Sequence, residues 1–452
     1  MEQEKRSRHG LLYRIFRIYV RYIHDRFFFR KVYRIGLQNV PANGTAVMVV
    51  SNHQNCLLDP MGVLLAFNDR KPNVIVRADV FAVHRWVDKA LRNLGLFPAF
   101  RLNFDGVAAL RKNRDTLSAS EQALVNGATL LLYPEGEHQD KHWLGDFTLG
   151  YTRLAFEAAA LDNFQTEIFI LPCCNHYSAY SDIQNDVLLK FGTPISIQPF
   201  YEMYKTKPRT AQREVNVLVR ERLMELMLHI TDLDNYGAID FLRHTYGRQY
   251  AKKLGLRPDY LPEKLHSDQQ FFKSLEKART DDPSEVQQIY REALTLETEI
   301  KKHKIRDDQL DNPPGWGCII AMMALIACLF PLWVFALLPN WIIYKAPIPV
   351  MLHVKDKMFH ASFLFGMSVL ATMPILYTLT FIGVWAFVNV WIAALYALAL
   401  PYLGLFAWYY RKYAVRTWQQ LRFWRLRKTD EIRQLKKLRT NLYERLNKIL
   451  KE

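Results

Sequence analysis

Residues 361–410 form a run of fifty positions without a single Asp, Glu, Lys or Arg. One helix needs about 20 apolar residues to cross the hydrocarbon core of a bilayer, so this run is long enough for two crossings and a short turn. A second uncharged run, residues 317–344, contains Pro331 and Pro339 and fits either one crossing or a re-entrant hairpin. We therefore expect residues 312–410 to form a hydrophobic membrane module with two to four membrane segments, and a hairpin followed by two crossings is the preferred arrangement.

The positive charge of the chain is concentrated at its two ends. The net charge is +16; residues 1–40 contain ten Lys and Arg against three Asp and Glu, and residues 411–452 contain fourteen against four. Such segments bind nucleic acid or an anionic membrane surface. Because the second follows an apolar run directly, we expect a basic cytoplasmic tail that binds anionic lipids, not nucleic acid. With both basic ends and residues 41–202 on the cytoplasmic face of an integral membrane protein, we expect an even number of crossings.

The first segment, residues 1–40, is predicted to lie on the membrane surface. A helical pattern over residues 11–29 places Arg14, Arg17 and Arg21 on one stripe. The opposite face is aromatic and aliphatic, with Leu12, Ile15, Phe16, Tyr19 and Ile23. Helices that lie in the bilayer interface have this pattern. A helix packed on its own domain has the same periodicity, so that alternative stays open.

Residues 41–202 alternate short apolar runs with helical patterns. The runs are "TAVMVVSN", "NVIV", "ATLLLYP", "EIFILPCC" and "DVLLKFG", and helices are expected at 106–126 and 150–161. This alternation predicts an α/β domain, a mixed sheet with flanking helices. Residues 203–311 are charged and predicted to be helical. The expected architecture is therefore an α/β domain followed by a helical segment and a C-terminal α-helical membrane module.

The stretch "SNHQNCLLDP", residues 51–60, places His53 and Asp59 directly after an apolar run. Six positions on a regular helix rotate Asp59 about 120° away from His53, so the two side chains meet only through an irregular turn. Pro60 favours such a turn, because the residue before proline avoids the helical region. A second interpretation makes Asp59 the N-cap of a helix that begins with Pro60. One carboxylate can serve both purposes.

Three further blocks follow in order along the chain. "GLFPAFR" ends at Arg101, "LLLYPEGEH" contains Glu135 and Gly136, and "IFILPCC" brings an apolar run to Pro172. Together with "SNHQNCLLDP" they resemble the glycerolipid acyltransferase superfamily, which contains glycerol-3-phosphate and lysophosphatidic acid acyltransferases. The resemblance covers about residues 30–200 and is specific for the superfamily rather than for a substrate.

The resemblance implies a membrane-bound O-acyltransferase of phospholipid biosynthesis. The acyl group would pass from acyl-CoA or acyl carrier protein to glycerol-3-phosphate or 1-acylglycerol-3-phosphate, and no further cofactor is expected. His53 would be the general base and Asp59 would orient its imidazole. The substrate-binding residues implied are Arg101 for the acceptor phosphate, Glu135 and Gly136 in the acceptor pocket, and Arg77 where many members carry Lys.

Three departures from the family pattern affect the choice of acceptor. Five residues separate His53 from Asp59 where four are usual, a spacing that some glycerol-3-phosphate acyltransferases share. The common "Glu-Gly-Thr-Arg" is "EGEH" here, so His138 replaces an arginine, and the lysine expected before a downstream glycine is missing from "DFTLG". An acyltransferase with an amine or non-phosphate lipid acceptor, and an inactive membrane adaptor, therefore remain alternatives.

The cysteines and remaining histidines give weaker signals. The five cysteines show no disulfide spacing, and we expect reduced thiols. Cys56 lies three residues after His53, but an apolar-flanked cysteine is more often structural than nucleophilic. His138 and His142, four residues apart, and the run "CCNH" that ends at His176 match no zinc spacing, so no metal site is expected.

Overall fold

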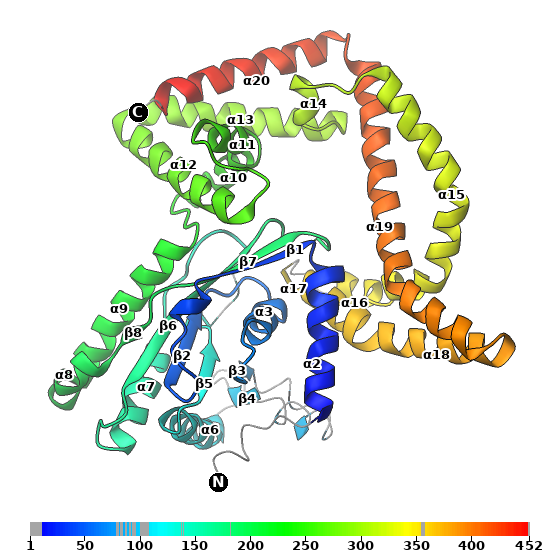
Figure 1. Ribbon diagram of the computed structural model, residues 1–452. Coiled ribbons are helices and arrows are strands. Elements are labelled where there is room, and N and C mark those ends of the chain that lie inside the picture. The colour runs from blue at the N-terminus through cyan, green and yellow to red at the C-terminus, as the bar shows by residue number, and fades with distance from the viewer. Residues whose placement is uncertain are drawn as a thin grey trace. The chain divides into compact units, whose positions relative to one another are not determined.

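The computed structural model describes residues 11–450, with gaps at 78–80, 82–84, 86–87, 90–91, 93–95, 100–107, 137, 139, 181 and 354–357. The chain divides into two compact units. The sheet unit contains Met1–His229 and Val350–Gly366, and the helical unit contains Ile230–Pro349 and Met367–Glu452. Figure 1 labels the elements of both units. The predicted boundaries at 40/41 and 202/203 do not coincide with this division.

The sheet unit is built on a mixed sheet, as predicted from the sequence. Its described strands are β1 (Lys31–Ile35), β2 (Ala46–Ser51), β3 (Asn73–Arg77), β4 (Leu96–Ala99), β5 (Thr129–Leu132), β6 (Ile168–Tyr177), β7 (Asp186–Phe191) and β8 (Ile195–Ser196). The order is β1-β7-β6-β2-β5-β3-β4, with β8 beside β6. β7 and β8 run antiparallel to β6, and the other neighbours are parallel. The five predicted runs are strands; β1, β4 and β8 were not predicted.

The sheet is covered on both faces, which explains why its central strands are continuously apolar. Along β2, alternate residues enter two separate cores. Met48 and Val50 pack with Leu154 and Val219 on one face. Val47 and Val49 pack with Val63 of α3 on the other. β2 is therefore fully buried, and its C-terminal end is a rigid support for the residues that follow.

The sheet unit also contains helices, some of which cover these two faces. They are α2 (Leu11–Ile23), α3 (Leu58–Ala66), α6 (Ala108–Val125), α7 (Gly150–Leu161), α8 (Tyr201–Thr206), α9 (Pro208–Leu226) and α17 (Met358–Leu364), with π-helical η1 (His24–Phe28). The helices predicted at 106–126 and 150–161 are α6 and α7. α17 belongs to this unit although the chain reaches it only after a long stretch of the helical unit.

The sequence left two interpretations of α2 open, a helix on the membrane surface and a helix packed on its own domain, and the structure has features of both. Val20 and Ile23 are buried, and Arg17 and Arg21 bind the side chain of Asn68, so the helix is packed on its own unit. An apolar stripe of Ile15, Ile18 and Tyr22 stays exposed. Two arginines of the basic stripe, Arg17 and Arg21, hold the helix to the domain. The exposed apolar stripe keeps a membrane-surface role as a prediction.

The helical unit contains α10 (Tyr236–His244), α11 (Tyr246–Lys253), α12 (Leu261–Asp281), α13 (Pro283–His303), α14 (Asp308–Asp311), α15 (Trp316–Lys345), α18 (Met373–Phe387), α19 (Val390–Leu426) and α20 (Asp430–Ile449). The short α16 (Ile348–His353) and π-helical η5 (Phe365–Thr372) lie at its borders with the sheet unit. α20 packs on α13. Arg439 pairs with Asp307 and Asp311, and Arg445 pairs with Glu285 and Glu292. The predicted helical character of residues 203–311 is confirmed.

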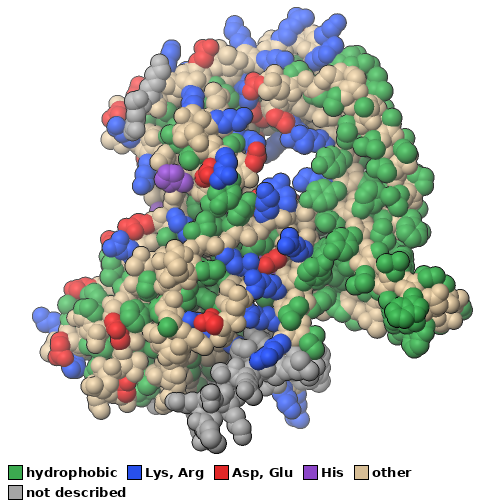
Figure 2. All heavy atoms as spheres, in the orientation of Figure 1, with side chains coloured by type: hydrophobic (Ala, Val, Ile, Leu, Met, Phe, Trp, Pro, Cys, Tyr) green, Lys and Arg blue, Asp and Glu red, His purple; other side chains and the backbone are tan. Residues whose placement is uncertain are grey.

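Among the described residues, three helices are long and apolar enough to cross a membrane: Trp316–His353, Phe359–Phe387 and Val390–Leu426. Figure 2 shows hydrophobic side chains spread over the outer surface of this part of the helical unit. The re-entrant hairpin preferred for the first uncharged run is wrong, because Pro331 and Pro339 lie inside the single helix α15. Packing along α19 supports this helix, with the Trp333 indole N–H donating to the Ala407 carbonyl at 3.2 Å.

Candidate active site

His53 follows the central strand of the sheet. β2 ends at Ser51, and Asn52 continues the contact with β6 because its side chain exchanges two hydrogen bonds with the backbone of Asn175, at 2.8 and 3.0 Å. Residues 52–57, here called the 52–57 turn, then lead into α3. In mixed and parallel sheets, ligand sites lie at the carboxyl ends of strands such as β2. The sheet therefore places His53 where a reactive group is expected.

The predicted hydrogen bond between His53 and Asp59 is confirmed. The His53 Nδ1 and Asp59 Oδ2 atoms are 2.8 Å apart. α3 begins at Leu58 with Leu57 as its N-cap residue, so Asp59 lies in the first helical turn and is not the N-cap. The irregular 52–57 turn brings the imidazole back to the carboxylate, as the helix geometry required.

Asp59 is completely buried and accepts hydrogen bonds on both oxygens. Oδ2 accepts from the backbone N–H groups of Gln54 and Asn55, each at 2.7 Å, as well as from His53. Oδ1 accepts from the Tyr177 hydroxyl at 2.6 Å. Because a carboxylate only accepts, Nδ1 of His53 carries the proton and the lone pair of Nε2 is the basic site of the ring. The carboxylate thus fixes both the orientation and the tautomer of His53.

Two tyrosines beside this pair were not identified from the sequence. Tyr133 follows β5, and its ring stacks on His53 with a centroid distance of 4.0 Å. Tyr177 ends β6 and is buried. Burial and the neighbouring Asp59 raise the pKa values of both phenols, so both stay protonated. β5 and β6 flank β2, and this strand order brings Tyr133 to His53 and Tyr177 to Asp59.

Glu135 supports the same turn from the loop after β5. Its Oε1 accepts from the His53 backbone N–H at 2.9 Å, and its Oε2 accepts from the Gly145 N–H at 2.8 Å. Burial raises the pKa of Glu135, while these two N–H donors oppose the shift. The contacts show Glu135 holding the backbone of His53, whereas the resemblance implied a place in the acceptor pocket. Its neighbour Gly136 has a φ of 69°, a left-handed conformation that favours glycine.

The basic residues predicted to bind the acceptor are only partly described. Arg77 is the last residue of β3, opposite Ala99 in the register, and its side chain lies outside the described part. Arg101 lies outside the described residues altogether. His138, which stands where the family has an arginine, packs its ring on His53 with a centroid distance of 3.9 Å. The His138 ring therefore contacts the His53 imidazole directly.

Strand β6 determines the positions of Cys173, Cys174 and His176. Cys173 and Cys174 are adjacent in β6 and enter opposite cores, so their thiols point away from each other. His142 packs its ring near His176, at a centroid distance of 5.2 Å, and bonds the Tyr180 hydroxyl at 2.9 Å. Cys56 is exposed in the 52–57 turn. A nucleophilic role for Cys56 stays an untested alternative.

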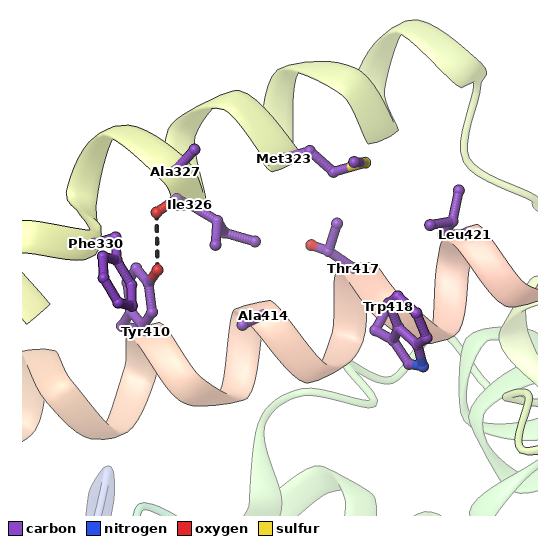
Figure 3. A pocket seen from close by; sticks show the side chains of 9 residues that line it. All are labelled: Met323, Ile326, Ala327, Phe330, Tyr410, Ala414, Thr417, Trp418 and Leu421. Carbon is purple, nitrogen blue, oxygen red and sulfur yellow. Dashed lines mark hydrogen bonds between the residues drawn. The ribbon is translucent and has the colours of Figure 1, made fainter.

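A second region of interest is a pocket in the helical unit. It has a volume of about 320 Å³ and lies between α15 and α19 (Figure 3). Its lining is Met323, Ile326, Ala327, Phe330, Tyr410, Ala414, Thr417, Trp418 and Leu421. The Tyr410 hydroxyl donates to the Ile326 carbonyl at 2.8 Å, which leaves Thr417 as the other hydroxyl of the lining. Without an acid or base, this pocket suits apolar ligands and not acid–base chemistry.

Comparison with known proteins shows similarity to acyltransferases over part of the chain. Residues 31–176 match the family model described as Acyltransferase. A curated Schizosaccharomyces pombe protein, named an uncharacterized acyltransferase, is 28% identical over 27% of this chain and 18% of its own length. A Mycoplasma pneumoniae protein, named a probable 1-acyl-sn-glycerol-3-phosphate acyltransferase, is 28% identical over 28% of this chain and 46% of its own length. This chain thus spans less than half of either curated relative.

Among solved structures, the 1-acyl-sn-glycerophosphate acyltransferase of Thermotoga maritima is similar, with 17% identity and a TM-score of 0.32 over 46% of this chain and 78% of that one. The family match contains β1 to β6, including the His53–Asp59 pair and Glu135. Residues 31–176 are therefore similar to the acyltransferase family, and the rest of the chain lies outside this match.

Proposed function

We propose that the chain is a membrane-bound O-acyltransferase that moves a fatty acyl group from an acyl thioester to the hydroxyl of a glycerolipid precursor. The observation that carries this proposal is the His53–Asp59 hydrogen bond at the carboxyl end of β2, inside the family match. The side chain of His53 is 14% exposed and that of Asp59 is fully buried. A partly exposed base with a buried carboxylate behind it is the arrangement that hydroxyl activation requires.

The proposed reaction begins when Nε2 of His53 removes the proton from the acceptor hydroxyl. The hydroxyl oxygen attacks the thioester carbonyl, the C–S bond breaks, and the new C–O ester bond forms. The departing thiolate takes the proton from the His53 imidazolium, which returns the base to its starting state. Asp59 stabilises the imidazolium while it exists and keeps Nδ1 protonated throughout.

The proposed acceptors are glycerol-3-phosphate and 1-acylglycerol-3-phosphate, with acyl-CoA or acyl carrier protein as donor. The name of the Mycoplasma relative supports the second acceptor, and the five-residue His–Asp spacing favours the first. Arg101 and Arg77 are the proposed phosphate ligands. A second candidate, transfer to an amine or an uncharged hydroxyl, is favoured by His138, which packs on His53 where the family carries an arginine.

Replacement of His53 tests the proposal. We expect His53→Ala to abolish acyl transfer, because the variant lacks the base. We expect membrane insertion to be retained, because the mutated residue is remote in sequence from the apolar helices. The purified membrane protein is incubated with acyl-CoA or acyl carrier protein and with phosphorylated, uncharged and amine acceptors, and the products are identified by mass spectrometry. Equal transfer by His53→Ala would refute the general base. Transfer by the parent only to unphosphorylated acceptors would replace the acceptor assignment.

We further propose that the apolar helices cross the membrane an even number of times, with the basic ends and the sheet unit on the cytoplasmic side. The ion pairs of Arg445 with Glu285 and Glu292 hold α20 on α13, and these two helices flank the three candidate spans. Two segments in contact lie on the same side of a bilayer, so the three candidate spans do not all cross.

Thiol labelling checks this arrangement. We expect Ser284→Cys and Thr440→Cys, each placed in a background without Cys56, Cys318 and Cys328, to react with a membrane-impermeant maleimide from the same side. Inverted and right-side-out vesicles give the two orientations to compare. Reaction of the two positions from opposite sides would contradict the even number of crossings.

A further inference from the structure

Part of the apolar module lies at the 52–57 turn. α17 is the first stretch of the candidate span Phe359–Phe387, yet it belongs to the sheet unit. The Ser362 hydroxyl of α17 accepts a hydrogen bond from the Leu57 N–H at 2.8 Å and donates to the side-chain oxygen of Asn55. One hydroxyl therefore joins two points of the turn, on either side of Cys56.

These two points lead directly to the His–Asp pair. Asn55 is fully buried, and its backbone N–H donates to Oδ2 of Asp59, the same oxygen that receives the His53 ring. Ser362 is 5% exposed, so water does not readily replace its hydroxyl. The path from Ser362 to His53 consists of buried hydrogen bonds through Asn55 and Asp59.

α17 and the residue that follows it are anchored at other points. Phe365 is completely buried and packs on Phe28 at a centroid distance of 5.0 Å. Phe359 packs on His138 at 5.0 Å, and His138 in turn contacts His53. Because aromatic packing holds this segment, removal of one hydroxyl is expected to leave it in place and to affect mainly the turn.

We propose that Ser362 is a positioning residue of the active site, supplied by the start of an apolar helix of the membrane module. This inference rests on the proposed function for the effect of Ser362 on catalysis. Ser362 holds the 52–57 turn in the shape that lets Asp59 reach His53. The membrane module then has a structural part in catalysis in addition to its affinity for lipid.

Removal of the hydroxyl changes the turn in a defined way. The Leu57 N–H and the Asn55 side-chain oxygen lose the partner they share, and buried groups left without a partner shift toward other contacts. A shift of about 1 Å in catalytic geometry costs roughly 100-fold in rate. We expect Ser362→Ala to lower kcat by roughly 10- to 100-fold with little change in KM, because the imidazole is misaligned while the substrate pocket is intact.

A serine in the same stretch of chain provides the matched control. Ser368 is also 5% exposed, and its hydroxyl donates to the Ile343 carbonyl at 2.8 Å within the helical unit. Ser368→Ala therefore removes a buried hydroxyl of equal exposure without touching the turn. Ser362→Thr keeps the hydroxyl and is expected to recover most of the parent's kcat.

Two measurements test the inference in the full-length protein. The first compares kcat and KM of the parent, Ser362→Ala, Ser362→Thr and Ser368→Ala with an acyl-CoA and the acceptor that the parent uses. The second measures amide hydrogen exchange of the peptide that covers residues 52–60, which needs no turnover. We expect faster exchange in Ser362→Ala than in the parent, Ser362→Thr or Ser368→Ala.

The outcomes separate the two proposals. A parent that transfers no acyl group to any acceptor refutes the proposed function, while the exchange measurement still decides whether Ser362 holds the turn. An active parent with equal kcat in Ser362→Ala and Ser368→Ala overturns the role of Ser362 and leaves the proposed function intact. Unchanged exchange of residues 52–60 in Ser362→Ala overturns it as well.

Discussion

Each unit of the molecule contains a buried polar side chain with several hydrogen-bond partners, Asp59 in the sheet unit and Asn340 in the helical unit. The two clusters differ in the chemistry of their members. In the sheet unit, Asp59 collects donors from His53, Gln54, Asn55 and Tyr177. In the helical unit, Asn340 is 2% exposed and joins three apolar helices. Both clusters satisfy a buried polar side chain, which is what folding requires of any such group.

The Asn340 cluster is closed. Its amide donates to the carbonyls of Ala336 and Leu400, at 3.0 and 3.3 Å, and its oxygen accepts from the Tyr377 hydroxyl at 2.8 Å. Gly404 faces it so closely that a Cβ atom there would lie 3.0 Å from the Asn340 oxygen. The members of this cluster are an amide, two backbone carbonyls and a phenol hydroxyl, so it holds helices together and supplies no general base.

The Asp59 cluster ends on a partly exposed imidazole. The His53 side chain is 14% exposed, whereas that of Asp59 is fully buried. Under the proposed function, the two clusters differ because the Asp59 cluster ends on a base in reach of substrate and the Asn340 cluster does not. Three substitutions, ordered by expected effect, test this distinction.

The largest effect is expected for Asp59→Asn. An amide carries no charge to stabilise the imidazolium, and one of its two polar atoms no longer accepts hydrogen bonds, so we expect kcat to fall by about 10³- to 10⁴-fold. Asp186→Asn is the control, because Asp186 is also buried but pairs with Arg30 at 2.8 Å. Steady-state acyl transfer measures the effect. A similar loss in both variants would show that the carboxylates act only through the fold.

A smaller effect is expected for Tyr177→Phe. This change removes one of the donors to Asp59 and leaves the ring, so we expect about a tenfold decrease in kcat, within the range for a hydrogen bond to a charged group. Tyr201→Phe is the matched control, since Tyr201 is buried and its hydroxyl donates to the Thr166 carbonyl at 2.8 Å, away from Asp59. Equal kcat in the two variants would show that the hydrogen bond from Tyr177 to Asp59 does not contribute to catalysis.

The smallest effect on activity is expected for Asn340→Ala. We expect unchanged kcat and a loss of about 1 kcal/mol in the free energy of unfolding of the helical unit, because interhelical hydrogen bonds in apolar surroundings contribute about that much. Thermal unfolding in detergent, measured beside acyl transfer, gives both quantities. A decrease in kcat as large as that of Asp59→Asn would mean that the closed cluster also takes part in catalysis.

The main outline of the molecule could be predicted from local sequence. The alternation of apolar runs between 41 and 202 predicted a mixed sheet, and the uncharged runs predicted the apolar helices, because burial on both faces of a strand and contact with lipid both leave a local pattern. Pro331 and Pro339 misled the prediction of a hairpin. Neighbouring helices can support a proline inside a helix, and that support is not visible in the local sequence.

The candidate site was likewise predicted in part from local sequence, while contacts between residues far apart in the chain decided the rest. The spacing of His53 and Asp59 with Pro60 showed that the two side chains could meet only across an irregular turn, but it left an N-cap role for Asp59 open, and the resemblance of the neighbouring blocks favoured the pair. The partners of that pair were decided by the tertiary structure. Tyr177 lies 118 positions from Asp59, and Ser362 lies 305 positions from Leu57. Strand order brings Tyr177 to Asp59, and the return of an apolar helix brings Ser362 to the turn. Contacts between residues so far apart leave no periodic signal in a single sequence.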